Sequence, residues 1–128
     1  MSDLRLESVP FTFEGRSYAL RCNMNVLADV QEAYGGDLTP ALTGRGTLRS
    51  VLEFLAAMMN DYADEQGWFD PDPLTGEAVL PKRFTMRSLG RRLRREEIPM
   101  VKILGLVTAA IAPKKKEESE PDPQDPGN

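Results

Sequence analysis

The sequence predicts an α+β fold: an N-terminal two-stranded β-hairpin packed on a small bundle of about four helices, followed by a disordered C-terminal tail. Between residues 9 and 22, apolar and polar side chains alternate, which is typical of two half-buried strands. Between residues 47 and 67, apolar side chains recur every three or four positions, which indicates one long amphipathic helix. Residues 113–128 contain four prolines but no Leu, Ile, Val, Met or aromatic residue, too little apolar area to offset the entropy of ordering them.

Length and composition indicate one domain. Of the 128 residues, we expect 1–8 to form a flexible arm, 9–112 the folded domain and 113–128 the tail. Histidine, the commonest general base and metal ligand, is absent, which makes an enzyme less expected but leaves catalysis by carboxylates open. The sequence also has no Gly-rich phosphate loop and no nucleophile with a base at usable spacing, so we expect no enzyme, metal site or cofactor. The single cysteine, Cys22, cannot form an internal disulfide, which fits a reducing compartment. No secretory signal or membrane-spanning apolar stretch is present, which favours a cytosolic protein.

The hairpin and the helix after it follow from residues 9–36. Glu14-Gly15 predicts a tight turn, because glycine readily takes positive φ. Asn23 or Asn25 can cap the helix, and Gly35-Gly36 ends it. We expect the inner face of the hairpin to pack on one stripe of this helix. The inner face consists of Phe11, Phe13, Tyr18 and Leu20, and the stripe consists of Leu27, Val30 and Tyr34.

The middle of the chain predicts one short and one long helix. Thr39 is the expected cap of a short helix over 40–43, and Thr47 caps the long one, which Gly67 ends. Met58-Met59 fits the core better than an adaptable partner surface, because both continue the buried stripe. The stripe expected inside is Leu48, Val51, Leu52, Leu55, Met58, Met59 and Tyr62, while Arg49, Glu53 and Asn60 are expected to face away.

Residues 68–84 break all periodicity and predict a long, proline-rich loop. Trp68-Phe69 is expected to pin its base to the core, with an exposed tip that remains a candidate for partner contact. The spacing of Asp70 and Asp72 is compatible with the start of a calcium-binding loop. The later ligands and the glycine of such a loop do not follow, so we favour two aspartates exposed to solvent.

A short helix over 86–93, capped by Thr85, carries the main charge feature. Between Lys82 and Arg95 there are seven basic residues and no acidic one. Three readings stay open: a phosphate-binding patch, a protein-binding patch, or a solvated helix face whose arginines pair with acids elsewhere. The candidate partner-binding residues here are Arg91, Arg92, Arg94 and Arg95.

The last helix is predicted to open at Glu96-Glu97 and Pro99, which suit a first turn, and is apolar nearly all round. Such a helix is either buried on several sides or shared with a partner. A central core helix is the first reading. The alternative is that one side docks another chain, with Met100, Leu104, Val107 and Ile111 as candidate partner-binding residues.

One pattern joins the hairpin to the first helix. Its first part is the motif Phe-x-Phe-x-Gly-x-x-Tyr-x-Leu, formed by Phe11, Phe13, Gly15, Tyr18 and Leu20. The pattern continues through Met24-Asn25 to Tyr34-Gly35 at the end of the helix. In this pattern the chain resembles the tail assembly chaperones of long-tailed (siphovirus-type) bacteriophages and the related small proteins of gene transfer agents. The resemblance extends over residues 11–112.

The resemblance implies a function. A protein of this family is no enzyme: it binds and solubilises the tape-measure protein and helps to recruit tail-tube subunits. It works in the bacterial host cytoplasm and is absent from the mature virion. The chain could also bind copies of itself, and the resemblance does not imply binding to a membrane. The family often makes a longer, frameshifted product, and the candidate frameshift position is Lys114, Lys115 and Lys116, although lysines that open a linker explain these residues equally well.

The alternative function is a nucleic-acid-associated phage accessory protein that uses the Arg83–Arg95 basic patch. Nucleic acid is the less favoured partner, because no aromatic side chain interleaves with the arginines to stack on bases.

Overall fold

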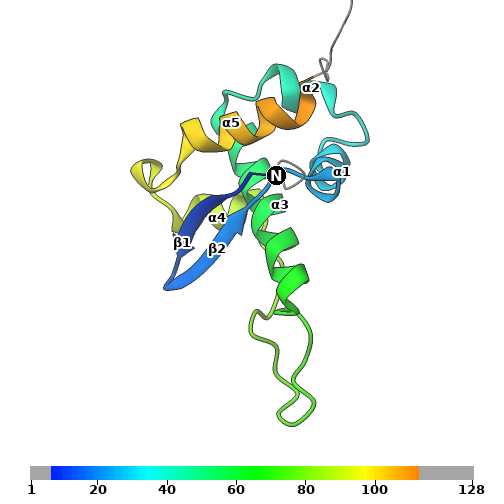
Figure 1. Cartoon of the computed structure of the whole chain (residues 1–128), viewed down its shortest axis with the longest axis vertical. Helices are drawn as coiled ribbons and strands as arrows, with labels where there is room; N and C mark the ends of the chain where they lie inside the picture. Colours follow the sequence, from blue (N-terminus) through cyan, green and yellow to red (C-terminus); the bar gives the residue numbers. More distant parts are fainter. Residues whose placement is uncertain (1–6, 113–128) are drawn as a thin grey trace, which may run out of the picture.

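The computed structural model describes residues 7–112, and the predicted α+β class is confirmed. A two-stranded sheet, five α-helices and one 3-10 turn follow one another along these residues (Figure 1). They are β1 (Val9–Phe13), β2 (Arg16–Leu20), α1 (Met24–Ala33), α2 (Thr39–Thr43), α3 (Leu48–Gln66), α4 (Met86–Arg92), η1 (Arg95–Glu97) and α5 (Met100–Ile111). The expected tail and most of the expected arm lie outside the described residues.

The hairpin forms as predicted. β1 and β2 are antiparallel, with Phe11 opposite Tyr18 and Phe13 opposite Arg16. Glu14 and Gly15 both have positive φ, 51° and 80°, which is the backbone of the two-residue turns whose twist matches the strands. The inner face is buried as expected, and the Phe13 ring meets the Phe84 ring edge-on at 5.6 Å between centroids.

The first helix begins at the first of its two candidate caps. Asn23 caps α1, because its side-chain oxygen accepts a hydrogen bond from the Val26 N–H at 3.0 Å. Asn25 instead donates to Asp61 of α3 at 3.2 Å. Val30 is buried as predicted, and Val26, which the predicted stripe omitted, is fully buried beside it.

The prediction for the cap of α2 is wrong. Thr39 is the first residue of that helix, and its own N–H donates to the Asp37 carboxylate at 3.0 Å. An acidic side chain two residues upstream is well placed to accept from this otherwise unpaired N–H. The Thr39 hydroxyl is therefore not needed as a cap.

The long helix α3 is the centre of the core. Thr47 caps it and Gly67 ends it in the left-handed conformation, both as predicted. Met58 and Met59 are fully buried, which confirms that they belong to the core. Leu48, however, is 48% exposed, contrary to prediction. It lies in the first turn, where a helical side chain leans back toward the N-terminus, past the elements that cover the rest of α3.

A second prediction for α3 also fails, because Asn60 does not face away from the fold. Its amide donates to the Phe84 carbonyl at 2.9 Å and accepts from the Phe84 N–H at 2.8 Å. This pair of bonds ties the end of the long loop to the middle of α3 and satisfies both backbone groups of Phe84.

Trp68 pins the base of the loop between α3 and α4 to the core, as predicted, whereas Phe69 is not part of the core and its ring lies 4.6 Å from the Arg83 guanidinium. Trp68 meets Tyr18 and Tyr62 edge-on, each at 5.5 Å between ring centroids. The Leu80 N–H donates to the Trp68 carbonyl at 3.0 Å, which closes the base. The tip extends away from the body (Figure 1), and Leu74 there is 94% exposed.

The last two helices are shorter than predicted: α4 ends earlier, and α5 begins later. Thr85 caps α4, but α4 ends at Arg92 and Leu93 is its C-cap. Glu96 and Glu97 belong to η1, and α5 begins only at Met100. Pro99 explains the break: it disfavours helical backbone in the residue before it, so Ile98 cannot join the helix.

We predict that Asn60→Ala lowers the free energy of unfolding by about 1–3 kcal/mol, because it leaves the partly buried Phe84 N–H and carbonyl without partners. Urea denaturation measures the change. The control is Gln66→Ala, an exposed site on the same helix, where we expect little change. Equal stability of Asn60→Ala and the parent chain would contradict the role of these bonds.

Candidate partner-binding surfaces

The predicted docking residues on α5 divide between the core and the surface. Val107 is fully buried against the rest of the core, so it is not available to a partner as the alternative reading supposed. Met100, Leu104 and Ile111 are half-buried, and the first two pack against the edge of the core.

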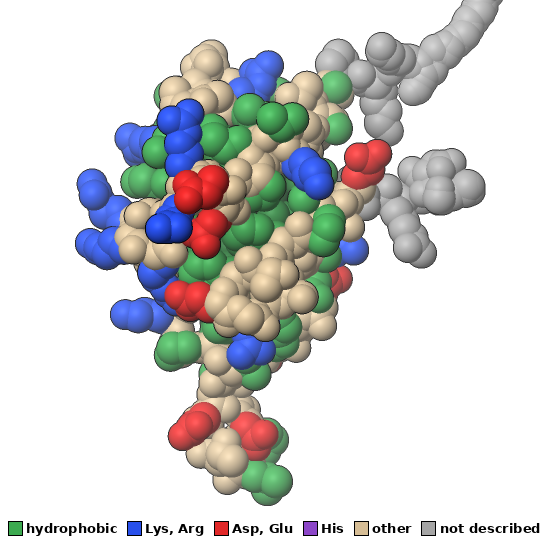
Figure 2. Space-filling view, turned by 90° about the vertical axis from the view of Figure 1, so that its left-hand side faces the viewer, with side chains coloured by type: hydrophobic (Ala, Val, Ile, Leu, Met, Phe, Trp, Pro, Cys, Tyr) green, Lys and Arg blue, Asp and Glu red, His purple; other side chains and the backbone are tan. Residues whose placement is uncertain are grey.

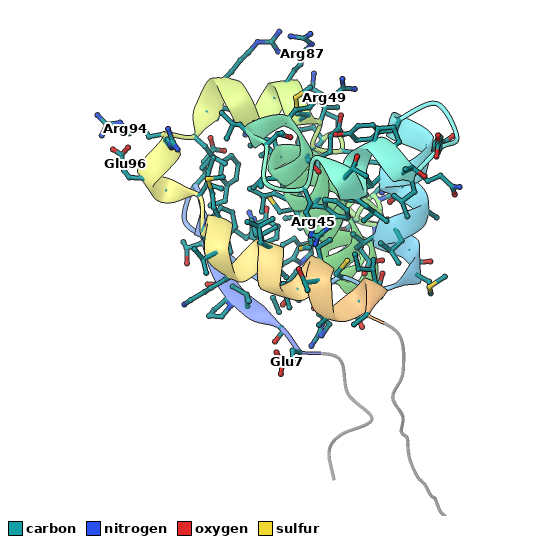
Figure 3. The ribbon with its side chains drawn as sticks, turned by 90° about the horizontal axis from the view of Figure 1, so that it is seen from above. Glu7, Arg45, Arg49, Arg87, Arg94 and Glu96 are labelled. Carbon is teal, nitrogen blue, oxygen red and sulfur yellow. The ribbon has the colours of Figure 1, made fainter. Side chains whose placement is uncertain are left out.

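The large apolar side chain that α5 exposes most is not one of the predicted partner-binding residues. Val101 is 83% exposed and lies three positions before Leu104, so the two side chains are neighbours on the helix surface. We call Met100, Val101, Leu104 and Ile111 the α5 surface. Figure 3 shows α5 and α4 on opposite sides of α3.

Part of the basic patch is already paired within the fold. Arg92 binds the Glu14 carboxylate through two hydrogen bonds, of 3.0 and 2.6 Å, and lies over the Phe13 ring at 5.0 Å. The hydrogen bond from Arg92 lowers the pKa of Glu14, and the same bond raises the pKa of Arg92. Arg92 therefore fastens α4 to the hairpin turn, and the reading of arginines paired with distant acids holds for this residue.

Two more arginines have acidic neighbours. Arg83 forms a two-point pair with Asp64 of α3, at 2.7 and 2.8 Å. Arg94 and Glu96, both strongly exposed, approach to 3.6 Å and point toward one another (Figure 3). Figure 2 shows that Lys and Arg side chains gather along one edge of the molecule. Within residues 7–112 no acid lies within 4.0 Å of the remaining members of the patch, Lys82, Arg87, Arg91 and Arg95.

A groove that the sequence did not predict runs between α1 and the start of α4. It has a volume of about 850 Å³. Its floor is α3, where the small side chains of Ala56 and Ala57 are almost completely buried. Asp29, Glu32 and Ala33 form the α1 wall, and residues 83–87 form the α4 wall. We call this feature the α1–α4 groove.

The α1–α4 groove carries more negative than positive charge. Arg83 neutralises Asp64 at one end, which leaves Asp29, Glu32 and Glu53 against Arg87. Burial raises the pKa of Glu53, an effect that nearby Arg49 partly offsets. Desolvation also raises the pKa of Asp29 at the rim, where Arg83 opposes the shift and Asp61, Glu32 and Asp64 add to it. Both carboxylates are thus less stable as anions here than in water.

The described residues hold no assembled metal centre: no three His, Cys, Asp or Glu side chains among them are grouped so that they could bind an ion. Cys22 is buried next to β2, and burial raises its pKa to about 11, so its thiol is a poor nucleophile at neutral pH. None of the helices between residues 7 and 112 is both long and apolar enough to cross a membrane. Lys114, Lys115 and Lys116, the candidate frameshift position, lie outside the described residues.

No protein-family model, curated protein or solved structure matches this chain.

We predict that Glu53→Gln raises Tm at pH 7 by a few degrees, because it removes a carboxylate whose ionised form the fold disfavours. The raised pKa means that the contribution of Glu53 to stability is fully present below the pKa of the unfolded chain. It is lost as the pH rises through the higher pKa of the folded state. The gain from Glu53→Gln should therefore shrink as the pH falls, which thermal unfolding at several pH values measures. Glu77→Gln, in the exposed loop, is the control, and a gain that persists at low pH would contradict the explanation.

Proposed function

We propose that this chain is a tail assembly chaperone of a long-tailed bacteriophage or a related gene transfer agent. It binds the tape-measure protein, keeps it soluble and helps to recruit tail-tube subunits. It acts in the host cytoplasm without catalysing a reaction, and it is absent from the finished particle. A longer product made by frameshifting near Lys114–Lys116 is part of the same proposal.

The observation that carries the proposal is the α5 surface. Val101 leaves most of its side chain in water beside half-buried Leu104 and Met100. An apolar side chain this exposed gains free energy when another molecule covers it, about 25 cal/mol per Å² of area removed from water. A long helical protein that exposes apolar stripes before assembly offers a matching surface.

The residues that carry the family resemblance add a second line of support. Phe11, Phe13, Tyr18 and Leu20 pack together as one buried face, and Gly15 occupies a position with positive φ. In this chain the pattern therefore specifies one packed unit of hairpin and helix.

The exposed arginines favour a second candidate, a nucleic-acid-associated accessory protein. Arg87, Arg91 and Arg95 have no acidic partner within 4.0 Å among residues 7–112. Binding through such a patch releases counterions from the phosphates, so it weakens steeply as salt rises. Contacts through the α5 surface are apolar and largely insensitive to salt.

We predict that co-expression with the tape-measure protein encoded beside this chain raises the soluble fraction of that protein severalfold, and that Val101→Asp abolishes the gain. A buried aspartate without a partner is costly in an apolar contact. Quantitative gels of the soluble and total fractions measure the effect. Val101 is exposed in the free chain, so Val101→Asp should not unfold it, which circular dichroism checks.

The matched control is Leu74→Asp, at the 94% exposed tip of the loop, which should leave the gain intact. No gain with the parent chain would overturn the chaperone proposal. Salt-sensitive binding to DNA or RNA that is lost in an Arg87→Ala, Arg91→Ala, Arg95→Ala triple variant would then favour the second candidate.

A further inference from the structure

Part of the basic patch has no acidic partner in the described fold. Lys82, Arg87, Arg91 and Arg95 are exposed, and no carboxylate among residues 7–112 lies within 4.0 Å of them. Arg87 lines the α1–α4 groove and shares it with several carboxylates. Arg91 and Arg95 do not line that groove. These two arginines are therefore the members of the patch that most need an explanation.

The acidic residues that follow Arg91 and Arg95 most closely in the sequence are both directed to Arg94. The Glu97 carboxylate accepts a hydrogen bond from the Arg94 N–H at 2.7 Å. The Glu96 carboxylate approaches the Arg94 guanidinium at 3.6 Å. Arg91, in the last turn of α4, and Arg95, the first residue of η1, are left for a further anionic partner.

The sequence after α5 supplies the opposite charge. Residues 117–125, which we call the acidic segment, contain no basic residue. Lys114–Lys116 directly precede this segment and can offset its first two carboxylates, but no lysine or arginine follows Lys116. The carboxylates of the acidic segment are those of Glu117, Glu118, Glu120, Asp122 and Asp125.

The chain after α5 is long enough to bring the acidic segment to these arginines. α5 is about 17 Å long at 1.5 Å per residue, and Arg95 lies only a short turn before it. Figure 3 shows neighbouring Arg94 at the end where α5 begins. Asp125 lies 13 positions after Ala112, and an extended, proline-containing chain spans about 40 Å over that length, at 3.1 Å per residue. The acidic segment can therefore run back along α5 and reach Arg95 and then Arg91.

Covalent attachment makes a weak contact of this kind effective. Exposed ion pairs are individually weak, because water and salt screen them. A short linker, however, holds the acidic segment near the patch at an effective concentration on the order of millimolar. Several carboxylates that exchange between two arginines then keep the patch occupied for much of the time at low salt.

We infer that the acidic segment binds Arg91 and Arg95 of its own chain and covers this end of the basic patch. A phosphate-bearing polymer that binds there at low salt must displace the segment. The contact is polar and weakens as salt rises. It uses neither the α5 surface nor the α1–α4 groove, and it does not depend on the proposed chaperone function.

The test places a nitroxide spin label inside the acidic segment of the full chain, at Gln124→Cys, and records backbone amide NMR signals. Cys22 is buried and its pKa is raised to about 11, so the label should not react there. In about 50 mM salt we expect the label to weaken the Arg91 and Arg95 signals at least about twofold relative to that of Leu74 at the loop tip. In about 500 mM salt the effect should disappear.

Two sets of substitutions test the two sides of the contact in the labelled chain. One neutralises the acidic segment with Glu120→Gln, Asp122→Asn and Asp125→Asn, and the other neutralises the patch with Arg91→Gln and Arg95→Gln. Each should restore the weakened signals in residues 91–95. Circular dichroism checks folding. The changes in the acidic segment lie outside the described fold, so they decide the outcome if the arginine variant is unstable.

The matched control neutralises three acids in the loop between α3 and α4, with Asp70→Asn, Asp72→Asn and Glu77→Gln. The net charge changes equally, and an asparagine at position 72 keeps the side-chain oxygen that accepts from the Leu74 and Thr75 N–H groups. This variant should keep the broadening. On heparin resin, a sulfated polyanion, the variant with the neutralised acidic segment should elute at about 1.5-fold higher salt than the loop variant.

Unchanged Arg91 and Arg95 signals in the labelled chain, or broadening that persists after the acidic segment is neutralised, would overturn the inference. Equal elution of the two variants from heparin would also overturn it. A mixture of spin-labelled chain without isotope and unlabelled ¹⁵N chain tests for contact between molecules. Equal broadening in that mixture would show that the acidic segment of a second copy is the occupant, which would overturn the contact within one chain.

Discussion

The burial of α3 is the constraint on which the rest of this structure depends. Phe54, Leu55, Met58 and Met59 are almost completely buried, and α1, β2, α4 and α5 all pack around this one helix. A helix covered from several sides leaves each covering element with an outer face of its own. Those outer faces carry the features that a partner can use, because the core leaves α3 little surface of its own.

Polar contacts fix the covering elements in place around α3. Arg92 joins α4 to the hairpin turn through Glu14, Arg83 joins the loop to α3 through Asp64, and Asn60 holds the backbone of Phe84. Each bond links segments far apart in the sequence. Two of them, those of Arg83 and Asn60, hold the α4 wall of the α1–α4 groove against α3, and the pairing of Arg83 and Arg92 takes both out of the basic patch. The patch is therefore smaller than its sequence suggests.

Two surfaces of different character result, separated by α3. The α5 surface is apolar and uncharged, whereas the α1–α4 groove combines small apolar side chains with carboxylates that burial disfavours as anions. The proposed function draws on the first of these surfaces, where apolar area lies open to water.

The sequence by itself determined the local structure. The caps at Asn23, Thr47 and Thr85 and the turn at Glu14-Gly15 depend on bonds within a few residues, so their side chains signal them directly. Which face of α5 is exposed could not be predicted from the sequence. The helix is apolar nearly all round, so no periodicity distinguishes exposed Val101 from buried Val107. The sequence did not predict the hydrogen-bond partners of Asn60, Arg83 and Arg92 or the existence of the groove either. They depend on where α1, α3 and the start of α4 meet, and only the packing of these distant segments around one buried helix decides that.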